Sequence, residues 1–450
     1  MRIFFAAQPY NKTHTSQEES RKNIDESERE ILLDNLKLYF KIASMYISRL
    51  IEKTLNEAVR SFPAVFIGGP RRSGKTTLSR RCLKDYNYVL LDEIDVRSLA
   101  IDDPRAFLDK YPPPVIIDEI QNAPGLLSHI KARIEHNKKP GQWVLTGSQQ
   151  WALMRGISET LAGRIAILHL FPFSLEEEQK DLRLGLSEAG AFLKNLSNVK
   201  RLPQKIIPLG IWILEGGYPE IVLNKRVSRK LWFSSYLQTY VDRDVRSYIK
   251  QSNLHDFERF VKLLAARTAQ ELNCSTLSRD IGISVPTIKS WLTLLEASGL
   301  IFFLMPYHKN FGKRIIKSPK CYFIDTGLVS YLVGLADKEH VLSGPMAGAL
   351  FETACVSQFY KRFSAFADPC SLYYYRSTDG LEVDLLVETG RTIYPIEIKL
   401  ASTIDYGRVS SLIKWLQISR LKDAHGLVIS TSRELGIMGK NVVNCHYSLI

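Results

Sequence analysis

The feature that most constrains the fold of this chain is the segment GGPRRSGKTTL at residues 68–78. It has the spacing G-x-x-x-x-G-K-[ST], follows the apolar run AVFI and precedes a helical pattern, which is the context of a phosphate-binding loop. Glycines let backbone N–H groups wrap phosphates, a lysine neutralises the β and γ oxygens, and a hydroxyl serves Mg²⁺. The pattern therefore predicts a site for ATP and Mg²⁺. Its residues are Gly69, Pro70, Arg71, Arg72, Ser73, Gly74, Lys75, Thr76 and Thr77, with Lys75 in a catalytic role and Thr76 as a metal ligand.

The second half of such a site is the run PVIIDEIQ at residues 114–121, a strand pattern that ends in two acids. Asp118 is predicted to hold Mg²⁺ through water, and Glu119 to activate the attacking water. Another strand pattern, QWVLTGSQQ, ends in Thr146 and Ser148, which could sense the γ-phosphate. Ordinary strand-end capping explains these two side chains almost as well.

Three arginines are candidates for contacting the phosphates, within the chain or from a neighbouring subunit of a homo-oligomer. Arg164 lies in LAGRIAIL, and Arg243 and Arg246 lie in TYVDRDVR. For each arginine alone, a surface or ion-pairing role is the stronger alternative. We include Arg164 among the predicted nucleotide-binding residues, and the sequence leaves the oligomeric state open.

The order of elements predicts an α/β fold with the parallel sheet of a P-loop NTPase, because five short apolar runs alternate with helical patterns between Ala64 and Phe173. The following stretch is mostly helical, with a break at EGGYPE, and the chain returns to mixed α/β near residue 345. We expect five regions: a disordered or dispensable arm at 1–44 with Met45 as a candidate start, the P-loop core at 45–175, a helical lid or linker at 176–254, a winged-helix module at 255–340, and an α/β domain at 341–450.

The winged-helix prediction rests on the run CSTLSRDIGISVPTIKSWLTLLEASGLIFFLMPY, which begins at Cys274. Gly282 is expected in the turn of a helix-turn-helix, with Ser284 capping the second helix. Winged helices bind DNA but also serve as protein-interaction and lid modules, so both partners stay open. Thr287, Lys289 and Ser290 are expected to be exposed, and the basic loop that carries Lys313, Arg314, Lys317 and Lys320 is expected to form the wing.

Near the C-terminus, EVDLLVETGRTIYPIEIK at residues 382–399 alternates apolar and charged residues on both sides of a turn. Side chains two apart on a strand share a face, so Glu382 lies beside Asp384, and Glu397 beside Lys399. A helical pattern upstream, GALFETACVSQFYKRF, carries Glu352 near its start. The alternative is a solvated hairpin with paired charges.

The motifs together resemble the prokaryotic AAA-type ATPases that carry a C-terminal domain of unknown function, the DUF4143 group. The resemblance runs through GGPRRSGKTTL, VIIDEIQNAPGLLSHIK, WVLTGSQQ, LAGRIAILHLFPFS, GGYPEIV and YLQTYVDRDVR, and it covers about residues 45–450. It implies ATP and Mg²⁺ at the P-loop and the acidic strand end. The leading forty-odd residues and the insertion SLEEEQKDLRLGLSEAGAFLKNLSNVK are not part of it.

The C-terminal pattern of helix Glu, strand Asp and Glu-x-Lys resembles the PD-(D/E)xK nuclease fold, which is restriction-endonuclease-like. The resemblance implies that Glu352, Asp384 and Glu397 gather one or two Mg²⁺ ions and that Lys399 is catalytic, orienting a water. An inactive descendant that keeps the fold to bind a partner is the alternative.

Composition limits the possible partners and the cellular location of the protein. The net charge of +13 permits a polyanionic partner such as DNA, although a basic surface without a ligand explains it equally well. The six scattered cysteines show no metal-binding spacing, and we find no apolar run long enough for a membrane span and no signal peptide, so a cytoplasmic protein is expected. Two functions compete: an ATPase whose nuclease-like domain acts on or binds DNA under nucleotide control, and a nucleotide-dependent switch that holds a partner protein.

Overall fold

The structure is a computed structural model that describes most of the chain beyond the N-terminal arm. The expected arm at 1–44 and the candidate start Met45 lie outside the described residues. Residues 47–450 form one compact unit. The described ranges are 46–148, 151–180, 188–246, 248–249, 253–307, 318–368, 370–378, 380–419, 425–439 and 441–450.

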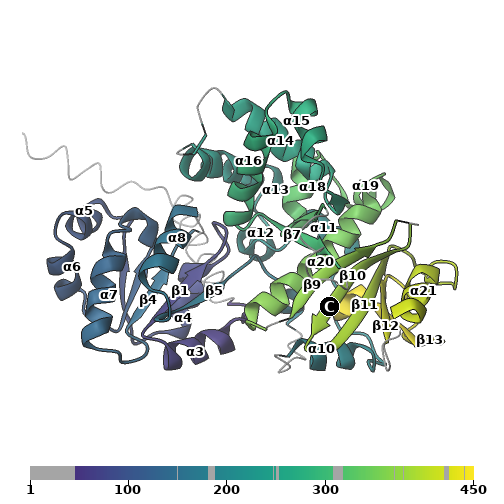
Figure 1. Ribbon diagram of the computed structural model, residues 1–450, viewed down its shortest axis with the longest axis horizontal. Coiled ribbons are helices and arrows are strands. Elements are labelled where there is room, and N and C mark those ends of the chain that lie inside the picture. Colours follow the sequence, from purple (N-terminus) through teal and green to yellow (C-terminus); the bar gives the residue numbers. More distant parts are fainter. Residues whose placement is uncertain are drawn as a thin grey trace, which may run out of the picture. The chain divides into compact units, whose positions relative to one another are not determined.

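The first sheet has five parallel strands in the order β2-β3-β4-β1-β5 (Figure 1). Each of the five predicted strands is present, so the predicted parallel sheet is confirmed. Its strands are β1 (Ala64–Gly68), β2 (Asn87–Leu90), β3 (Val115–Asp118), β4 (Trp143–Thr146) and β5 (Ile165–His169), and its helices are α3 (Glu52–Ser61), α4 (Lys75–Cys82), α5 (Ile94–Asp102), α6 (Pro104–Lys110), η1 (Ile120–Asn122), α7 (Leu126–His136) and α8 (Trp151–Thr160).

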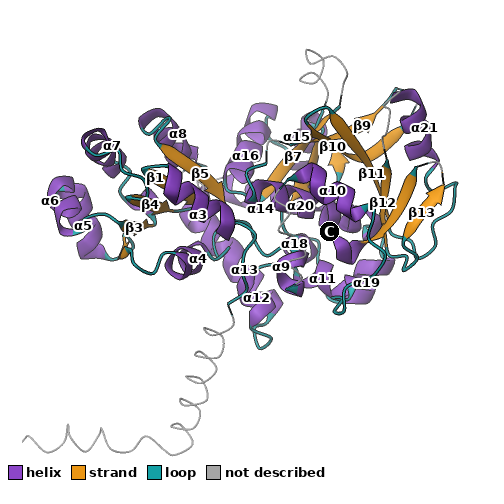
Figure 2. Cartoon of the chain, turned by 90° about the horizontal axis from the view of Figure 1, so that it is seen from below, coloured by secondary structure: helices purple, strands orange, loops and turns teal. Residues whose placement is uncertain are grey.

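Helices cover both faces of this sheet, which is why its strands read as continuous apolar runs (Figure 2). In β1, Ala64 and Phe66 pack in a core with α7 and α8, and Val65 and Ile67 pack in another core with α3 and α4. Alternate side chains of one strand thus enter two different cores. The P-loop follows the carboxyl end of β1, where such sheets bind ligands.

The chain after β5 is helical, as the sequence predicts. The break at EGGYPE is confirmed: Gly216 ends α11 with φ 68°. A Cβ on Gly217 would meet the Phe173 carbonyl oxygen at 2.2 Å, so only glycine fits there. The elements are α9 (Leu175–Gln179), α10 (Ala189–Leu196), α11 (Leu209–Glu215), α12 (Pro219–Leu223), α13 (Arg229–Tyr240), the π-helix η2 (Val241–Val245) and α14 (Leu254–Ala266).

The second sheet has nine strands in the order β13-β14-β12-β11-β10-β9-β7-β8-β6. Strand β7 pairs with β9 in parallel, Met305 opposite Tyr373, so the two C-terminal regions expected from the sequence share one sheet. The strands are β6 (Gln270–Glu271), β7 (Ile301–Pro306), β8 (Lys320–Phe323), β9 (Ser371–Arg376), β10 (Glu382–Thr389), β11 (Thr392–Lys399), β12 (Gly426–Ser430), β13 (Gly436–Gly439) and β14 (Val442–His446), and the helices are α15 (Cys274–Ile281), α16 (Val285–Ala297), α18 (Thr326–Leu332), α19 (Lys338–Ser343), α20 (Ala347–Ala365), α21 (Ser410–Ser419) and η4 (Tyr447–Leu449).

The helix-turn-helix signals are present where the sequence places them. Gly282 ends α15 with φ 86°, and the Ser284 hydroxyl caps α16 by accepting from the Thr287 N–H. Lys289 and Ser290 are exposed, whereas Thr287 is half-buried. Most of the predicted wing, with Lys313, Arg314 and Lys317, lies outside the described residues.

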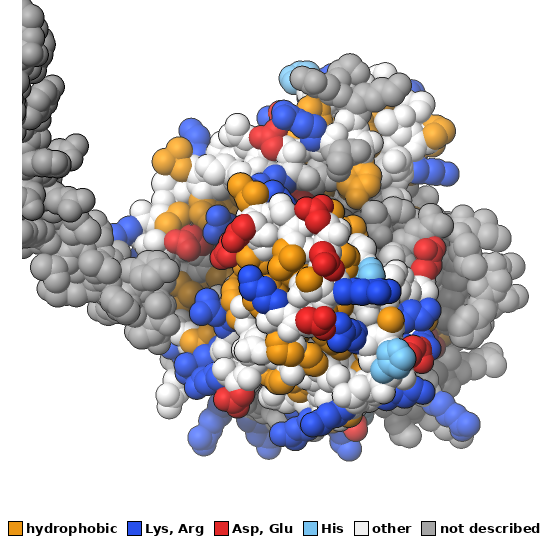
Figure 3. Space-filling view, turned by 90° about the vertical axis from the view of Figure 1, so that its left-hand side faces the viewer, with side chains coloured by type: hydrophobic (Ala, Val, Ile, Leu, Met, Phe, Trp, Pro, Cys, Tyr) orange, Lys and Arg blue, Asp and Glu red, His pale blue; other side chains and the backbone are white. Residues whose placement is uncertain are grey.

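No helix in the described part of the chain is long and apolar enough to cross a membrane. On the face shown in Figure 3, basic and acidic side chains are interleaved. The positive net charge is therefore not gathered into a single patch on that face.

Candidate functional site

Lys75 begins α4 directly after the P-loop and turns back over the loop. Its buried Nζ donates hydrogen bonds to the carbonyl oxygens of Gly69 at 3.0 Å and Pro70 at 2.9 Å. A Cβ at Gly69 would meet the Leu170 carbonyl oxygen at 2.0 Å, and Gly74 has φ 99°, so both positions need glycine. The loop thus folds as the motif predicts.

The charge of Lys75 is only partly compensated. Burial lowers its pKa to about 8, against the opposing effects of Glu119 and Asp118. Within the described residues, the ammonium bonds to neutral carbonyls and forms no ion pair within 4.0 Å. An anionic group entering the loop would therefore gain from this charge.

Asp118 collects three hydroxyl donors at the end of β3. It accepts hydrogen bonds from Thr76 Oγ1 at 2.6 Å, from the Tyr88 hydroxyl at 2.8 Å and from Thr146 Oγ1. The structure thus brings Thr76, Asp118 and Thr146 together. Tyr88, on the neighbouring strand β2, was missed because its position in an apolar strand gave no signal. Carboxylate and hydroxyl oxygens suit Mg²⁺.

Glu119 follows in a left-handed conformation with φ 60°. Its carboxylate accepts a hydrogen bond from Gln121 Nε2, a residue that the sequence reasoning missed. The negative charge of Glu119 acts on Lys75 and Arg71, which places the carboxylate at the P-loop. A strained backbone of this kind is common at functional sites.

Several buried polar atoms around the loop have no hydrogen-bond partner in the described structure. They are Ser73 Oγ, Ser148 Oγ and Gln121 Oε1. Leaving such groups unpaired costs free energy, so a polar ligand at this site would satisfy them. These residues therefore fit a nucleotide with its metal ion.

The two arginines of the P-loop differ in their surroundings: Arg71 pairs with Asp244, and Arg72 is exposed. The Arg71 guanidinium donates two hydrogen bonds to Asp244, at 2.6 and 2.8 Å. Asp244 lies on the π-helix η2, so this bidentate pair joins the P-loop to the helical region. Arg72, next in the loop, is exposed with φ 62°.

The remaining arginine candidates form ion pairs at the surface. Arg246 lies 2.8 Å from Asp242, and Arg243 lies 4.0 Å from Asp92. Among these candidates, none contacts the P-loop in the described structure.

Arg164 corrects a sequence expectation. It immediately precedes β5, where its carbonyl accepts from the Ala64 N–H at the amino end of β1. The P-loop follows the opposite end of β1, and Arg164 pairs with Glu135 instead. Within one chain, Arg164 therefore does not lie at the nucleotide site, because the strand length separates them.

Arg49 is a buried contact of the P-loop that sequence reasoning missed. Its guanidinium donates to the carbonyl oxygens of Ser73 at 3.0 Å and Phe171 at 2.6 Å, and it pairs with Glu177 at 3.1 Å. The same 171–177 segment bonds to α20, since Lys361 Nζ donates to the Phe173 carbonyl at 3.1 Å. The P-loop is thus connected to α20 through one short segment.

The second candidate site lies on β10 and β11. Lys399 Nζ is 2.5 Å from Glu397 Oε1 and 3.7 Å from Asp384, whose other contact is a hydrogen bond of 2.8 Å from the Ile398 N–H. Glu397 Oε2 is buried and has no hydrogen-bond partner in the described structure. The structure therefore brings Asp384, Glu397 and Lys399 together.

Glu352 is held by different partners. Its Oε1 accepts from the Tyr322 hydroxyl at 2.6 Å and from Lys320 Nζ at 3.0 Å. Lys320 also lies 2.8 Å from Glu382. Both Lys320 and Tyr322 come from β8.

Two sequence expectations change here. Within the described residues, no group of three or more acidic, histidine or cysteine side chains is arranged to hold a metal ion, so the implied set of Glu352, Asp384 and Glu397 is not assembled. Lysines contact these carboxylates instead: Lys320 contacts Glu352, and Lys399 contacts Glu397 and lies 3.7 Å from Asp384. Lys320, expected in the basic loop of the wing, is instead buried beside Glu352 and Glu382.

The charges of these carboxylates nevertheless shift the pKa values of neighbouring groups. Burial and the charge of Asp384 raise the pKa of Glu352 to about 7 and that of Glu397 to about 8. For Lys320, the charges of Glu352, Asp384 and Glu382 outweigh burial and raise its pKa. The cluster is therefore an electrostatic unit in which neutralising cations matter.

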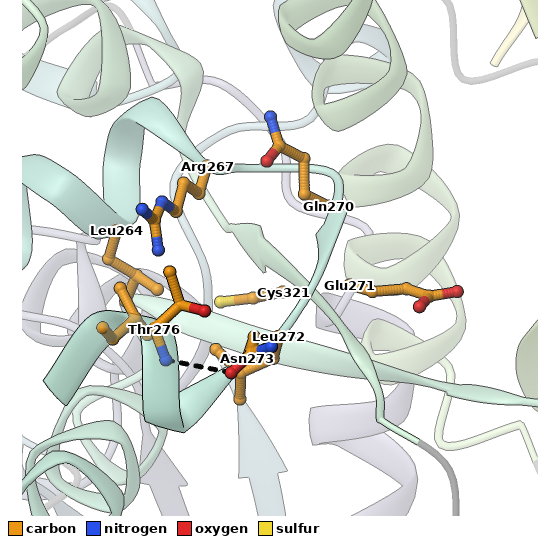
Figure 4. Close-up of a pocket in the computed structure, with 9 residues that line it drawn as sticks. Leu264, Arg267, Gln270, Glu271, Leu272, Asn273, Thr276 and Cys321 are labelled. Atoms are coloured by element: carbon orange, nitrogen blue, oxygen red, sulfur yellow. Dashed lines mark hydrogen bonds between the residues drawn. The ribbon is translucent and has the colours of Figure 1, made fainter. Parts of the chain in front are cut away.

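A cavity of about 280 Å³ lies elsewhere, between α14, β6 and α15 (Figure 4). Asn273 Oδ1 accepts from the Thr276 N–H at its edge, and Arg267 pairs with Asp280. It contains none of the predicted site residues. The lining residues are Leu264, Arg267, Gln270, Glu271, Leu272, Asn273, Thr276, Leu277 and Cys321.

Comparison with protein families gives three matches along the chain. Residues 61–178 match the model of an AAA domain, and residues 347–447 match the domain of unknown function DUF4143. The chain is an AAA-type P-loop protein with a C-terminal DUF4143 domain. Between the AAA and DUF4143 domains, residues 209–339 match another domain of unknown function, DUF8612. Lys320 and Tyr322 thus come from the DUF8612 region and reach Glu352 of the DUF4143 domain.

Two curated proteins resemble most of this AAA–DUF4143 chain. They are the uncharacterized protein Mb2031c of Mycobacterium bovis and the uncharacterized protein Rv2008c of Mycobacterium tuberculosis. Each is 28% identical over 384 residues, which cover 85% of this chain and 80% of the relative.

Solved structures resemble parts of the chain. The Walker-type ATPase PABY2304 of Pyrococcus abyssi has a TM-score of 0.41 at 15% identity, covering 64% of this chain and 96% of that one. A signal transduction ATPase with a tetratricopeptide repeat sensor from Pyrococcus horikoshii has a TM-score of 0.25 at 14% identity, covering 70% and 48%.

Proposed function

We propose that the AAA domain binds and hydrolyses ATP. The observation that carries this proposal is the P-loop lysine, whose buried ammonium rests on the carbonyls of Gly69 and Pro70 without a carboxylate within ion-pair distance. A site built this way gains most from an incoming phosphate.

Each residue of the site has a distinct role in this proposal. Lys75 would turn from the loop carbonyls to the phosphates, and Thr76 and Asp118 would hold Mg²⁺. The bound ion would neutralise charge on the phosphate oxygens. Glu119 would orient and deprotonate the attacking water, while Thr146, which donates to Asp118, and Ser148 would sense the γ-phosphate.

ATP turnover of the purified full chain tests this proposal. Lys75→Ala is expected to abolish hydrolysis and weaken nucleotide binding, because the main positive charge of the loop is lost. Lys53→Ala, at an exposed position on α3, is the matched control. Hydrolysis that persists in Lys75→Ala would contradict the proposal.

For the DUF4143 domain, we propose Mg²⁺-dependent action on DNA under the control of the nucleotide. The supporting observation is the buried, unpaired Oε2 of Glu397 beside Asp384 and Lys399, because an unsatisfied carboxylate oxygen suits a hard cation. Asp384 and Glu397 would hold the ion, and Lys399 would orient the water. The exposed side chains of Lys289 and Ser290 on α16 would contact DNA.

A series of hydrogen bonds connects the P-loop to helix α20 and could carry the nucleotide control. Arg49 binds the Ser73 carbonyl in the P-loop, and Lys361 of α20 binds the segment that Arg49 also holds. Helix α20 carries Glu352 near its start. A change in the P-loop would therefore act on the helix that lines the carboxylate site.

Cleavage of labelled single- and double-stranded DNA and RNA, with Mg²⁺ or Mn²⁺ and with or without ATP, tests the nuclease proposal. Loss of cleavage in Asp384→Ala is expected, and Lys75→Ala is expected to change its rate. Glu388→Ala, on the same strand, controls for nonspecific effects.

A second candidate is a nucleotide-dependent switch whose DUF4143 domain holds a partner protein. The observation in its favour is that Glu352 is already neutralised by Lys320, as in a site that no longer needs a metal. If the wild-type protein turns over ATP but cleaves no substrate, this result would favour the switch function.

A further inference from the structure

The buried ammonium of Lys320 joins two carboxylates from separate elements of the C-terminal site. Its Nζ lies 3.0 Å from Glu352 of α20 and 2.8 Å from Glu382 of β10. The lysine side chain is only 5% exposed. Its Nζ also lies 5.5 Å from the centre of the Tyr374 ring, which favours a cation at this position.

This arrangement gives the cluster an asymmetry. On the Lys320 side, Glu352 is satisfied by an ammonium and by the Tyr322 hydroxyl. On the other side, Glu397 keeps a buried oxygen without a partner, and its neighbour Lys399 is 32% exposed. One half of the cluster is therefore complete, and the other half can still accept a ligand.

We infer that Lys320 is a built-in cation that fills one cation position of the C-terminal site, between Glu352 and Glu382. An exchangeable divalent cation then has a single place, at Asp384 and Glu397. This second statement rests on the proposed function, whereas the filled position rests on the contacts of Lys320 alone.

The charges of Glu352 and Glu382 explain why a cation is needed between them. A divalent ion prefers carboxylate oxygens, and without the ammonium the charge of Glu352 would lose its compensation, while Glu382, which is 33% exposed, would keep only Arg376 at 3.9 Å within the described structure. Lys320 cannot dissociate as a bound ion does, so its position stays neutralised when the metal concentration falls. Removing the ammonium would leave Glu352 and Glu382 able to take a divalent ion in its place.

Binding of Mn²⁺ to the full chain without nucleotide, followed by the electron paramagnetic resonance signal of free Mn²⁺, tests the inference. Wild-type protein is expected to bind one ion that Asp384→Asn removes. Lys320→Met is expected to bind one ion more than wild type, and Mn²⁺ is expected to raise its melting temperature more. Lys262→Met, at an exposed position on α14, is expected to match wild type.

A further variant separates loss of folding from loss of the site. Lys320→Met with Glu382→Gln removes one charge together with the ammonium, so it is expected to fold without Mn²⁺ and to lose the extra ion again. The inference is overturned if Lys320→Met binds no more Mn²⁺ than wild type, or if saturating Mn²⁺ raises its melting temperature no more than that of wild type.

The two proposals fail in different ways. If wild-type protein binds no Mn²⁺ while Lys320→Met gains one ion, the built-in cation stands and the metal site at Asp384 and Glu397 is lost. If wild type binds one ion and Lys320→Met gains none, the metal site stands and the built-in cation is wrong.

Discussion

The nucleotide site and the C-terminal carboxylate site each contain a buried lysine, but the two lysines have opposite surroundings. Lys75 rests on backbone carbonyls, and burial lowers its pKa to about 8. Lys320 sits between two carboxylates that raise its pKa. The first positive charge is available to an incoming anion, while the second is already used. The same residue type therefore marks an open site in one region and a self-neutralised one in the other.

The comparison is sharpened most by removing one carboxylate charge in each region. In Glu119→Gln, ATP turnover is expected to fall roughly 10²- to 10³-fold because the general base is lost. Nucleotide affinity is expected to persist, since the side chain keeps its shape. Glu352→Gln is the matched change and should leave turnover within about twofold, because Glu352 bonds to Lys320 and Tyr322. Steady-state hydrolysis and nucleotide titration check both variants, and unchanged turnover in Glu119→Gln would contradict the assignment.

A second test replaces each lysine by methionine and measures urea unfolding in the presence of a chelator. Lys320→Met is expected to lower the free energy of unfolding by about 3 kcal/mol, because it leaves the carboxylate of Glu352 without its ammonium. Lys75→Met is expected to be neutral or stabilising, because its ammonium is desolvated without a paired carboxylate. Equal losses in the two variants would break the comparison.

A third test concerns Glu178, which lies on α9 in the segment between the two sites. Burial raises its pKa from 4.5 to about 8, with Lys361 opposing. The folded state therefore binds more protons than the unfolded state in this window, and stability falls as pH rises through it. Glu178 alone therefore changes the free energy of unfolding by up to about 1.4 kcal/mol per pH unit.

Glu178→Gln is expected to remove that share of the pH dependence, leaving stability at low pH little changed and raising it above pH 8. Chemical unfolding at several pH values measures the slope. Glu57→Gln, at an exposed position on α3, is the control. A slope that is unchanged in Glu178→Gln would mean that this carboxyl ionises freely in the folded protein.

The smallest effect is expected for Arg164→Ala. Arg164 pairs with Glu135 near the protein surface, on the edge of the sheet opposite the P-loop. Such a pair contributes at most about 1 kcal/mol to stability, and ATP turnover should stay within about twofold of wild type. A collapse of turnover that depends on protein concentration would show that Arg164 acts on the nucleotide of a neighbouring subunit.

The sequence predicted the parts of the fold that depend on residues close together in the chain. The five strands, the glycine-dependent turn of the P-loop, the Ser284 cap and the Gly282 turn each depend on residues close in sequence. The approach of Asp118 to Thr76 was also predictable, because the carboxyl ends of parallel strands lie at one edge of the sheet.

Long-range partners were not predictable in the same way. Arg49 reaches Ser73 and Phe171 through backbone carbonyls, which every residue carries, so no sequence pattern marks them. Lys320 was assigned to the basic loop of the wing because the residues before it are basic. Its burial depends on β8 lying within reach of α20, and only the sheet order shows this.

The pairing of β7 with β9 has a practical consequence for how this protein can be divided. Strand β7 also pairs with β8, so it is an interior strand whose loss would leave rows of unpaired backbone groups on both sides. A chain cut between the DUF8612 and DUF4143 regions would separate Lys320 from Glu352. It would also expose unpaired strand edges, which promote aggregation. Genetic exchange that swapped one half alone would do the same, so the two regions are best regarded as one heritable unit.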